Sequence, residues 1–258
     1  VSQLRRLVQP FLLRRLKKRC PQGTSAQEEY VRKISLSEDE QKLYYACVQA
    51  AVADLGDEQG KLQILAALTR LRQVCCDPGL CFENYEGSTS KLDACVELCE
   101  AMVENGHQIL LFSQFTSMLD RLRARLDALH ISNYTLQGST PKEKRASMVK
   151  AFNAGEASVF LISLKAGGTG LNLTAADIVI HFDPWWNQAA QNQATDRAHR
   201  IGQQAHVQVY KLIAKDTIEE KILELQEKKA ALLDTISGGE EAGILNMSSE
   251  ELLSLLKS

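Results

Sequence analysis

The residues best suited to chemistry lie in the last third of the chain. Gln193, Arg197 and Arg200 are spaced i, i+4 and i+7, so on a helix they would share one face. An amide and two guanidinium groups on one stripe match the oxygens of a phosphate, because a guanidinium donates paired hydrogen bonds in one plane. A solvated arginine face has the same spacing. The glycine-rich loop and the tryptophan pair just upstream favour a phosphate, and specifically a triphosphate.

Other elements of a nucleotide site are missing from the sequence. No Gly-x-x-x-x-Gly-Lys-Ser/Thr loop occurs, and residues 167–170 lack the helix signal of a dinucleotide-binding loop. Asp183 ends the apolar run 178–182, as a magnesium-binding aspartate would. Without a cradle lysine upstream, a strand-end turn is the favoured interpretation. The chain has arginines for a phosphate but no cradle for it, which predicts half of a two-part site.

Alternating helices and strands must position these groups. Short apolar runs predict strands at 109–112, 132–136, 159–162, 178–182 and 207–213. Amphipathic stretches between them predict helices at 90–104, 117–129, 187–200 and 217–233. Such alternation indicates an α/β fold with a mostly parallel sheet and helices on both faces. Polar residues that follow strands then gather at the carboxyl edge of the sheet, where ligands bind in such folds.

Composition and helix signals suggest four parts. They are a basic linker helix (residues 1–22), a helical insertion or hairpin (residues 23–88), the α/β lobe (residues 89–235), and a linker with a tail helix (residues 236–258). Capping boxes predict helix starts at Ser37, Thr140 and Ser248. In a capping box, a Ser or Thr and a Glu three residues later each accept a hydrogen bond from the other's backbone N–H. Whether the tail helix docks on the rest of the chain is left open by the sequence.

Charge and cysteine content narrow the functional classes. The net charge is −2, but residues 1–20 carry seven basic side chains and no acidic ones. Such an arm can bind phosphates or form a solvated face, and both remain open. Seven cysteines without a signal peptide or an apolar stretch of membrane length indicate reduced, cytosolic thiols, so we expect a protein that is neither secreted nor membrane-bound. Cysteines 75–99 fit no Cys-x-x-Cys pair, so no metal site is assigned.

Five ordered motifs reveal a family resemblance that covers residues 4–235. They are Pro10–Arg15, Leu71–Pro78, Leu110–Phe115, Leu136–Thr140 and Asp196–Gln203. Together they closely resemble the second, RecA-like motor lobe of the Swi/Snf family of superfamily-two DNA translocases. The fold implied is a three-layer sandwich with a helical insertion and a C-terminal helix. Residues 188, 191 and 192 depart from the family pattern, which puts in doubt the turn after the tryptophan pair and its local charge.

The resemblance implies a division of labour between two lobes. A first lobe upstream would bind ATP and Mg²⁺, and this chain would donate Arg197 and Arg200 as arginine fingers, with Gln193 holding the phosphate or a water. Gly168, Thr169 and Gly170 would form a nucleotide-binding loop that also acts as a nucleotide-sensing loop. Contacts to the double-stranded DNA backbone are expected from Ser113, Gln114, Gly138, Ser139, Thr140, Ser163, Lys165, Gly167, Trp185 and Trp186. A core position for one or both tryptophans stays open.

Partners and alternatives follow from the same resemblance. Double-stranded DNA, the first motor lobe of the same polypeptide and DNA-bound proteins are the expected partners. The isolated chain should not hydrolyse ATP, because half of the site is absent. A non-catalytic DNA-binding or partner-docking module is the main alternative. A Rossmann-like metabolic enzyme is disfavoured by the missing glycine fingerprint, and strand separation in place of translocation stays open.

Overall fold

The computed structural model describes residues 27–54, 60–167, 171–198, 206–235 and 247–257. The predicted basic helix at 1–22, the nucleotide-sensing loop 168–170 and Arg200 lie outside these residues. Among the described helices, none combines the length and apolarity needed to cross a membrane.

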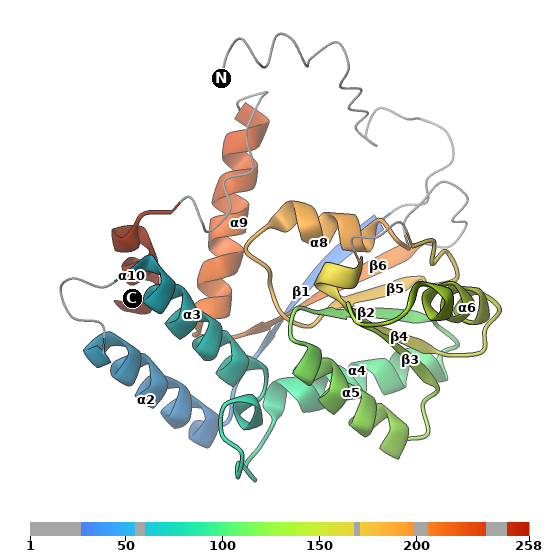
Figure 1. Cartoon of the computed structure of the whole chain (residues 1–258), viewed down its shortest axis with the longest axis horizontal. Helices are drawn as coiled ribbons and strands as arrows, with labels where there is room; N and C mark the ends of the chain where they lie inside the picture. Colours follow the sequence, from blue (N-terminus) through green and yellow to red (C-terminus); the bar gives the residue numbers. More distant parts are fainter. Residues whose placement is uncertain (1–26, 55–59, 168–170, 199–205, 236–246, 258) are drawn as a thin grey trace.

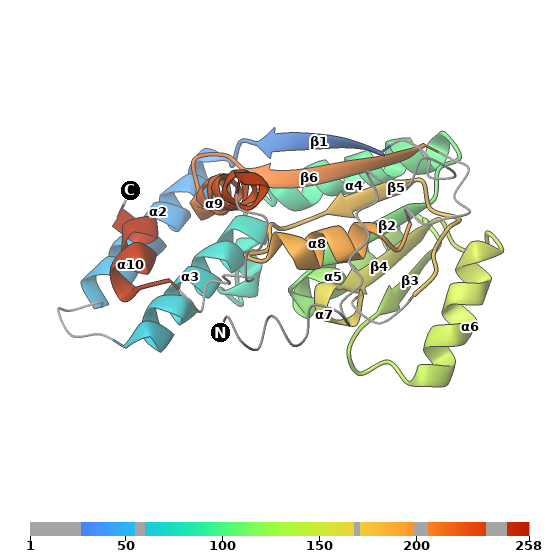
Figure 2. The ribbon, with the colours of Figure 1, turned by 90° about the horizontal axis from the view of Figure 1, so that it is seen from above.

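A parallel sheet forms the centre of the molecule. Its strands are β1 (Gln27–Ile34), β2 (Ile109–Ser113), β3 (Asn133–Leu136), β4 (Val159–Ser163), β5 (Ile178–His181) and β6 (Val207–Ala214). The order across the six-stranded sheet is β1-β6-β5-β2-β4-β3, and every neighbouring pair is parallel. Figure 2 shows this order from one edge to the other. All five strands predicted from apolar runs are present. Because every pair is parallel, the carboxyl ends of all strands lie on the same side of the sheet, which we call its carboxyl edge.

Alternate residues of the central strands bury opposite faces of the sheet. In β2, Ile109 and Leu111 belong to one core cluster, whereas Leu110 and Phe112 belong to the other. This follows from the two-residue period of a strand, which sends successive side chains to opposite faces. The central strands are apolar throughout because both faces are covered by helices, as is usual for parallel sheets.

Helices cover the two faces as the α/β pattern requires. Helices α4 (Ser90–Glu104) and α5 (Thr116–Ala128) lie on one face, and α6 (Lys142–Asn153) and α8 (Gln188–Thr195) on the other (Figure 1). A single turn, α7 (Leu164–Gly167), follows β4. The predicted three-layer α/β architecture is therefore confirmed, with a sheet that is parallel throughout.

Four further helices form a separate core beyond the carboxyl end of β1. They are α2 (Glu38–Asp54), α3 (Lys61–Cys76), α9 (Ile218–Thr235) and the tail helix α10 (Ser249–Lys257), and we call them the helical group. Leu252 of α10 is fully buried there, and Lys221 of α9 donates to the Leu255 carbonyl at 2.9 Å. The tail helix is thus docked, which the sequence alone left open.

Capping boxes were predicted correctly in the helical group but not in the lobe. Ser37 and Glu40 exchange hydrogen bonds at 2.8 and 3.2 Å, and Ser248 and Glu251 do so at 2.6 and 3.1 Å. The box predicted at Thr140 is wrong. Its hydroxyl accepts from the Gln137 N–H at 3.0 Å instead, so α6 begins without a side-chain cap.

Strand β1 lies within residues 23–88, the part predicted as a helical insertion or hairpin, and this strand was not predicted. It pairs with β6 over its whole length and forms one edge of the sheet. Residues 28–33 are all exposed, because an edge strand has few neighbours to bury it. Charged residues therefore occupy positions that would be apolar in a central strand, and the pattern of a buried strand is absent.

Docking of α10 predicts a large difference between two leucine truncations. Leu252→Ala removes a fully buried side chain and should lower the free energy of unfolding by about 2–5 kcal/mol. Leu62→Ala in α3, where the leucine is 81% exposed, should change it by less than about 0.5 kcal/mol. Urea unfolding followed by circular dichroism measures both values. Equal, small effects would contradict the docked position of α10.

Candidate nucleic-acid interface

A groove of about 460 Å³ opens where α3 meets the carboxyl edge of the sheet. Its floor comes from segments that follow β2, β4 and β5, and its wall comes from α3. The lining residues are Leu65, Thr69, Arg72, Gln114, Phe115, Leu164, Lys165, Trp185, Trp186 and Ala190. Gln114, Lys165 and both tryptophans were predicted as DNA contacts, and the structure brings these four together.

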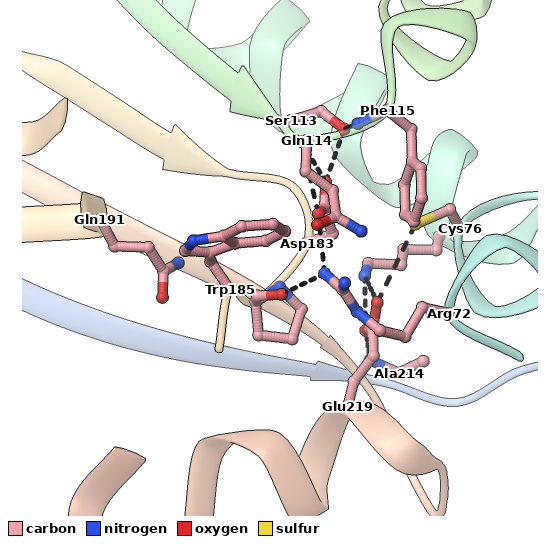
Figure 3. A network of polar contacts seen from close by, with 12 residues as sticks. Arg72, Cys76, Ser113, Gln114, Phe115, Asp183, Trp185, Gln191, Ala214 and Glu219 are labelled. Atoms are coloured by element: carbon pink, nitrogen blue, oxygen red, sulfur yellow. Dashed lines mark hydrogen bonds and ion pairs between the residues drawn. The ribbon is translucent and has the colours of Figure 1, made fainter. Parts of the chain in front are cut away.

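Arg72 is buried among the residues that line this groove and contacts several of them. Its side chain is 2% exposed, and its guanidinium lies 5.4 to 5.6 Å from the ring centres of Phe115, Trp185 and Trp186. Nη2 donates to the Pro184 carbonyl at 2.5 Å and pairs with Asp183 Oδ2 at 3.3 Å (Figure 3). Cation–π contacts are strongest when water is excluded. One guanidinium therefore orients three aromatic rings around the groove.

Asp183 joins α3 to the ends of two strands. Besides Arg72, its carboxylate accepts from the Ser113 hydroxyl at 2.5 Å and from the Gln114 backbone N–H at 3.2 Å. Burial raises the pKa of Asp183, while Arg72 and Ser113 act in the opposite direction. Because the buried carboxylate is already bonded to these three residues, Asp183 has a structural role here. This agrees with the strand-end turn favoured from the sequence over a magnesium site.

A second buried ion pair lies beside the first. Lys91 at the start of α4 contacts both carboxylate oxygens of Glu219 in α9, at 2.5 and 2.6 Å. Glu219 also accepts from the Ala214 N–H at 2.8 Å, and Lys91 lies 5.0 Å from the ring centre of Phe182. Both side chains of the pair are about 1% exposed or less. This pair fastens the helical group to the sheet and was not anticipated from the sequence.

The backbone after Trp185 is held from α9. Gln226 donates to the Trp185 carbonyl and, at 2.6 Å, to the side-chain oxygen of Gln191. Asn187 caps α8 by accepting from the Ala189 N–H at 2.9 Å. Gln191, one of the residues that depart from the family pattern, thus forms an amide pair with α9 next to the turn after the tryptophans.

His181 anchors the other end of α8. Its Nε2 lies 2.9 Å from the Thr195 hydroxyl, and its ring stacks on Phe112 with a centroid distance of 5.6 Å. Burial, with a smaller effect of the Lys211 charge, lowers the pKa of His181 from its ordinary 6.5 to about 3. The imidazole is therefore neutral at physiological pH and serves as a fixed hydrogen-bonding link between β5 and α8.

The predicted DNA contacts separate into accessible and buried sets. Ser113 is fully buried with its hydroxyl on Asp183, and Ser163 is 3% exposed, so neither is proposed further as a contact. Gly138, Ser139 and Thr140 form a turn beside a second groove of about 710 Å³, which Lys142 and Arg145 also line. Gly167 ends α7.

Two members of the predicted phosphate stripe, Gln193 and Arg197, lie in the described part of the chain, whereas Arg200 does not. Helix α8 ends at Thr195, and the N–H groups of Arg197 and Ala198 bond three residues back, at 3.1 Å each. The chain is therefore wound more tightly at Arg197 and Ala198 than in an α-helix. Gln193 is exposed, whereas Arg197 is only 4% exposed and its carbonyl accepts from the Leu173 N–H at 3.1 Å. Gln193 and Arg197 therefore differ in accessibility, and the shared face of the three residues stays a prediction.

The cysteines within the described chain contribute to packing. Cys75, Cys76, Cys95 and Cys99 are buried, and burial raises the pKa of Cys76 well above its ordinary value. No group of three or more His, Cys, Asp or Glu residues in the described ranges could hold a metal ion.

Comparison with known proteins defines the class. The helicase conserved C-terminal domain family matches residues 90–202, and the SNF2-related domain family matches residues 1–80. An uncharacterized ATP-dependent helicase of Mycoplasma genitalium is 37% identical over 99% of this chain and 25% of its own length. The fold and these matches identify a helicase-type C-terminal lobe. The chain spans about a quarter of the length of the curated relatives it matches.

Solved structures give the family. The Sulfolobus solfataricus SWI2/SNF2 ATPase C-terminal domain is 30% identical, with a TM-score of 0.70, over 89% of this chain and 97% of that domain. The core of that ATPase in complex with double-stranded DNA is 31% identical, with a TM-score of 0.72, over 98% of this chain and 55% of that one. The chain belongs to the SWI2/SNF2 family and corresponds to its C-terminal motor lobe.

The buried Arg72–Asp183 pair predicts a strong asymmetry between single and double substitutions. Arg72→Met leaves the Asp183 carboxylate without its cation and should cost about 3–5 kcal/mol of unfolding free energy. Adding Asp183→Asn should restore part of that loss, since no uncompensated charge remains. Chemical denaturation of the two variants tests this. Arg123→Met, on the exposed face of α5, is the control and should cost less than about 0.5 kcal/mol. A loss below about 1 kcal/mol for Arg72→Met would contradict the role given to the pair.

Neutral, buried His181 predicts a pH-dependent stability. The unfolded chain binds a proton at this residue below about pH 6.5, whereas the folded chain does not until about pH 3. The unfolded state therefore binds more protons in this window, and stability falls as pH falls. Between pH 7.5 and 5, His181 should remove about 2 kcal/mol.

The matched variants for this effect are His181→Gln and His130→Asn. His181→Gln should flatten the decrease in unfolding free energy with falling pH, whereas His130→Asn at an exposed position should leave it unchanged. Urea titrations at several pH values provide the comparison. Parallel curves for the native chain and His181→Gln would show that the buried imidazole titrates normally.

Proposed function

We propose that this chain is the second half of an ATP-driven motor that moves along double-stranded DNA. In this role it grips the DNA backbone and completes an ATP site on a first lobe of the same polypeptide. The observation that carries the proposal is the match over almost the whole SWI2/SNF2 ATPase C-terminal domain. The solved core of that ATPase in complex with double-stranded DNA supports duplex DNA as the substrate.

The groove beside α3 supplies suitable chemistry for a DNA backbone. Exposed Lys165 provides a cation, Gln114 an amide, and Trp185 and Trp186 flat apolar surfaces. Contacts to phosphate and sugar position a protein on the duplex without reading its sequence. A motor that moves along DNA needs this kind of grip, because it must bind every sequence it meets.

The nucleotide contacts are assigned to Gln193 and Arg200. The exposed amide of Gln193 fits one phosphate oxygen, and the sequence holds no cradle for the rest of a nucleotide. ATP and Mg²⁺ are therefore assigned to the first lobe, where the metal ion would neutralise phosphate charge. Arg200 would add a planar cation to the γ-phosphate. Residues 168–170 stay a predicted nucleotide-sensing loop.

Arg197 receives a different role from the one predicted. Since its side chain is 4% exposed, we propose that it supports the segment before Arg200 and does not touch the nucleotide. The hydrogen bond from Leu173 to its carbonyl ties this segment to the chain that follows residue 170. The same burial is the observation that favours the alternative, a DNA-binding or docking module without motor activity.

The two-part site predicts how activity depends on the first lobe and on Arg200. The isolated chain should hydrolyse ATP negligibly, and in the complete protein Arg200→Ala should lower DNA-stimulated ATP hydrolysis by about 10³-fold or more. Steady-state ATPase assays with and without duplex DNA measure this, and circular dichroism checks the fold. Arg123→Ala is the matched control and should hydrolyse ATP at the native rate.

Each outcome separates the candidate functions. Strong hydrolysis by the isolated chain, or a near-native rate for Arg200→Ala, would overturn the two-part site. A complete protein that binds duplex DNA but shows no DNA-stimulated hydrolysis would establish the non-catalytic alternative.

A further inference from the structure

The turn between β3 and α6 is held from the inside by one arginine. Arg145 Nε donates to the Thr140 carbonyl at 2.8 Å, and Nη2 donates to the carbonyls of Gly138 and Gln137 at 2.8 and 3.3 Å. The turn is closed by the Thr140 N–H on the Gln137 carbonyl at 3.1 Å. A single half-buried guanidinium thus collects three carbonyl oxygens of residues 137–140.

This arrangement decides which backbone groups of the turn remain available. Its carbonyls are directed onto Arg145, whereas the N–H groups of Gly138 and Ser139 have no acceptor within the described chain. Gly138 and Ser139 are exposed, and a Cβ added at Gly138 would meet no atom within 4 Å. The turn therefore offers donors and open space on its outer side, next to the groove that Lys142 and Arg145 line.

We propose that Arg145 is a positioning residue, which holds the 137–140 turn in the shape that presents its N–H groups to a phosphate of the DNA backbone. This inference rests on the proposed function and adds a residue that family resemblance did not single out. A phosphate needs donors, and a loose turn would expose carbonyl oxygens that repel it. Because Arg145 donates hydrogen bonds to those carbonyl oxygens, they are turned away from the outer side of the turn, which makes that side favourable for an anion.

The geometry of the guanidinium is essential to this role. Its donors lie in a rigid plane and can reach several acceptors at once, whereas a lysine ammonium is a compact charge on a flexible stem. Arg145→Lys keeps the charge but cannot hold three carbonyls in one plane. This substitution therefore distinguishes a positioning role from a simple electrostatic one.

The experiment compares three variants of the complete protein that contains this chain. Arg145→Lys and Arg145→Gln should both speed hydrogen exchange in a peptide covering residues 137–141. Both should weaken binding to a duplex DNA of random sequence by roughly tenfold, from the lost charge-assisted hydrogen bonds. Lys144→Gln, at an exposed neighbouring position of α6, should leave exchange unchanged and affinity within about twofold, apart from a small change in salt dependence.

Gly138→Ala tests the contact itself without disturbing the turn. Since its added methyl group has open space in the free protein, exchange and thermal stability should stay at native values. A phosphate bound close to the backbone would meet that methyl group, so affinity for duplex DNA should fall by several-fold.

Three results would overturn the proposal. Native exchange in Arg145→Lys would show that the turn does not depend on the guanidinium. Native DNA affinity in Arg145→Lys despite faster exchange, or in Gly138→Ala, would show that the turn does not contact the backbone. Failure of the proposed function gives a different result from failure of this inference. If the protein does not bind duplex DNA through this lobe, the native protein and Trp186→Ala, a variant of the first groove, would bind duplex DNA equally weakly.

Discussion

The candidate nucleic-acid interface depends on the burial of Arg72 against Asp183. An ion pair removed from water is costly unless further hydrogen bonds and contacts satisfy both partners. Here Ser113 and the Gln114 backbone complete the carboxylate, while three aromatic rings and the Pro184 carbonyl surround the guanidinium. The pair fixes α3 against the ends of β2 and β5. It thereby sets the width of the groove and the orientation of the tryptophans that line it.

The second buried pair, Lys91 with Glu219, extends the same principle to the helical group. It connects the start of α4 with the start of α9, and α9 in turn holds the Trp185 carbonyl through Gln226. The helical group is therefore part of the platform that presents the interface. Docking of α10 against α2, α3 and α9 completes its core. A rigid platform suits the proposed role, in which the lobe transmits movement between a nucleotide site and DNA.

Within the described residues, two accessible regions at the carboxyl edge contain predicted DNA contacts. One is the groove of Gln114, Lys165 and the tryptophans, and the other is the turn that Arg145 organises. Both display neutral donors next to cationic side chains, which fits positioning on a backbone better than recognition of bases. A net charge of −2 gives the chain no overall attraction for DNA, so the proposed contact depends on the local arrangement of these groups.

Local sequence signals determined the order and type of nearly all elements, because strand period, helix period and capping boxes act over a few residues. The boxes at Ser37 and Ser248 are examples, and the family motifs pointed to the correct lobe. Thr140 shows the limit: its hydroxyl had two possible partners, and the tertiary turn selected the Gln137 N–H. Strand β1 escaped detection because an exposed edge carries no buried pattern. The pairing of Arg72 with Asp183 joins residues 111 positions apart, and the burial of Arg197 depends on how the chain winds after α8. Only the folded structure could decide these features, because they result from contacts between segments that are far apart in the sequence, and local sequence patterns do not indicate which distant segments will meet.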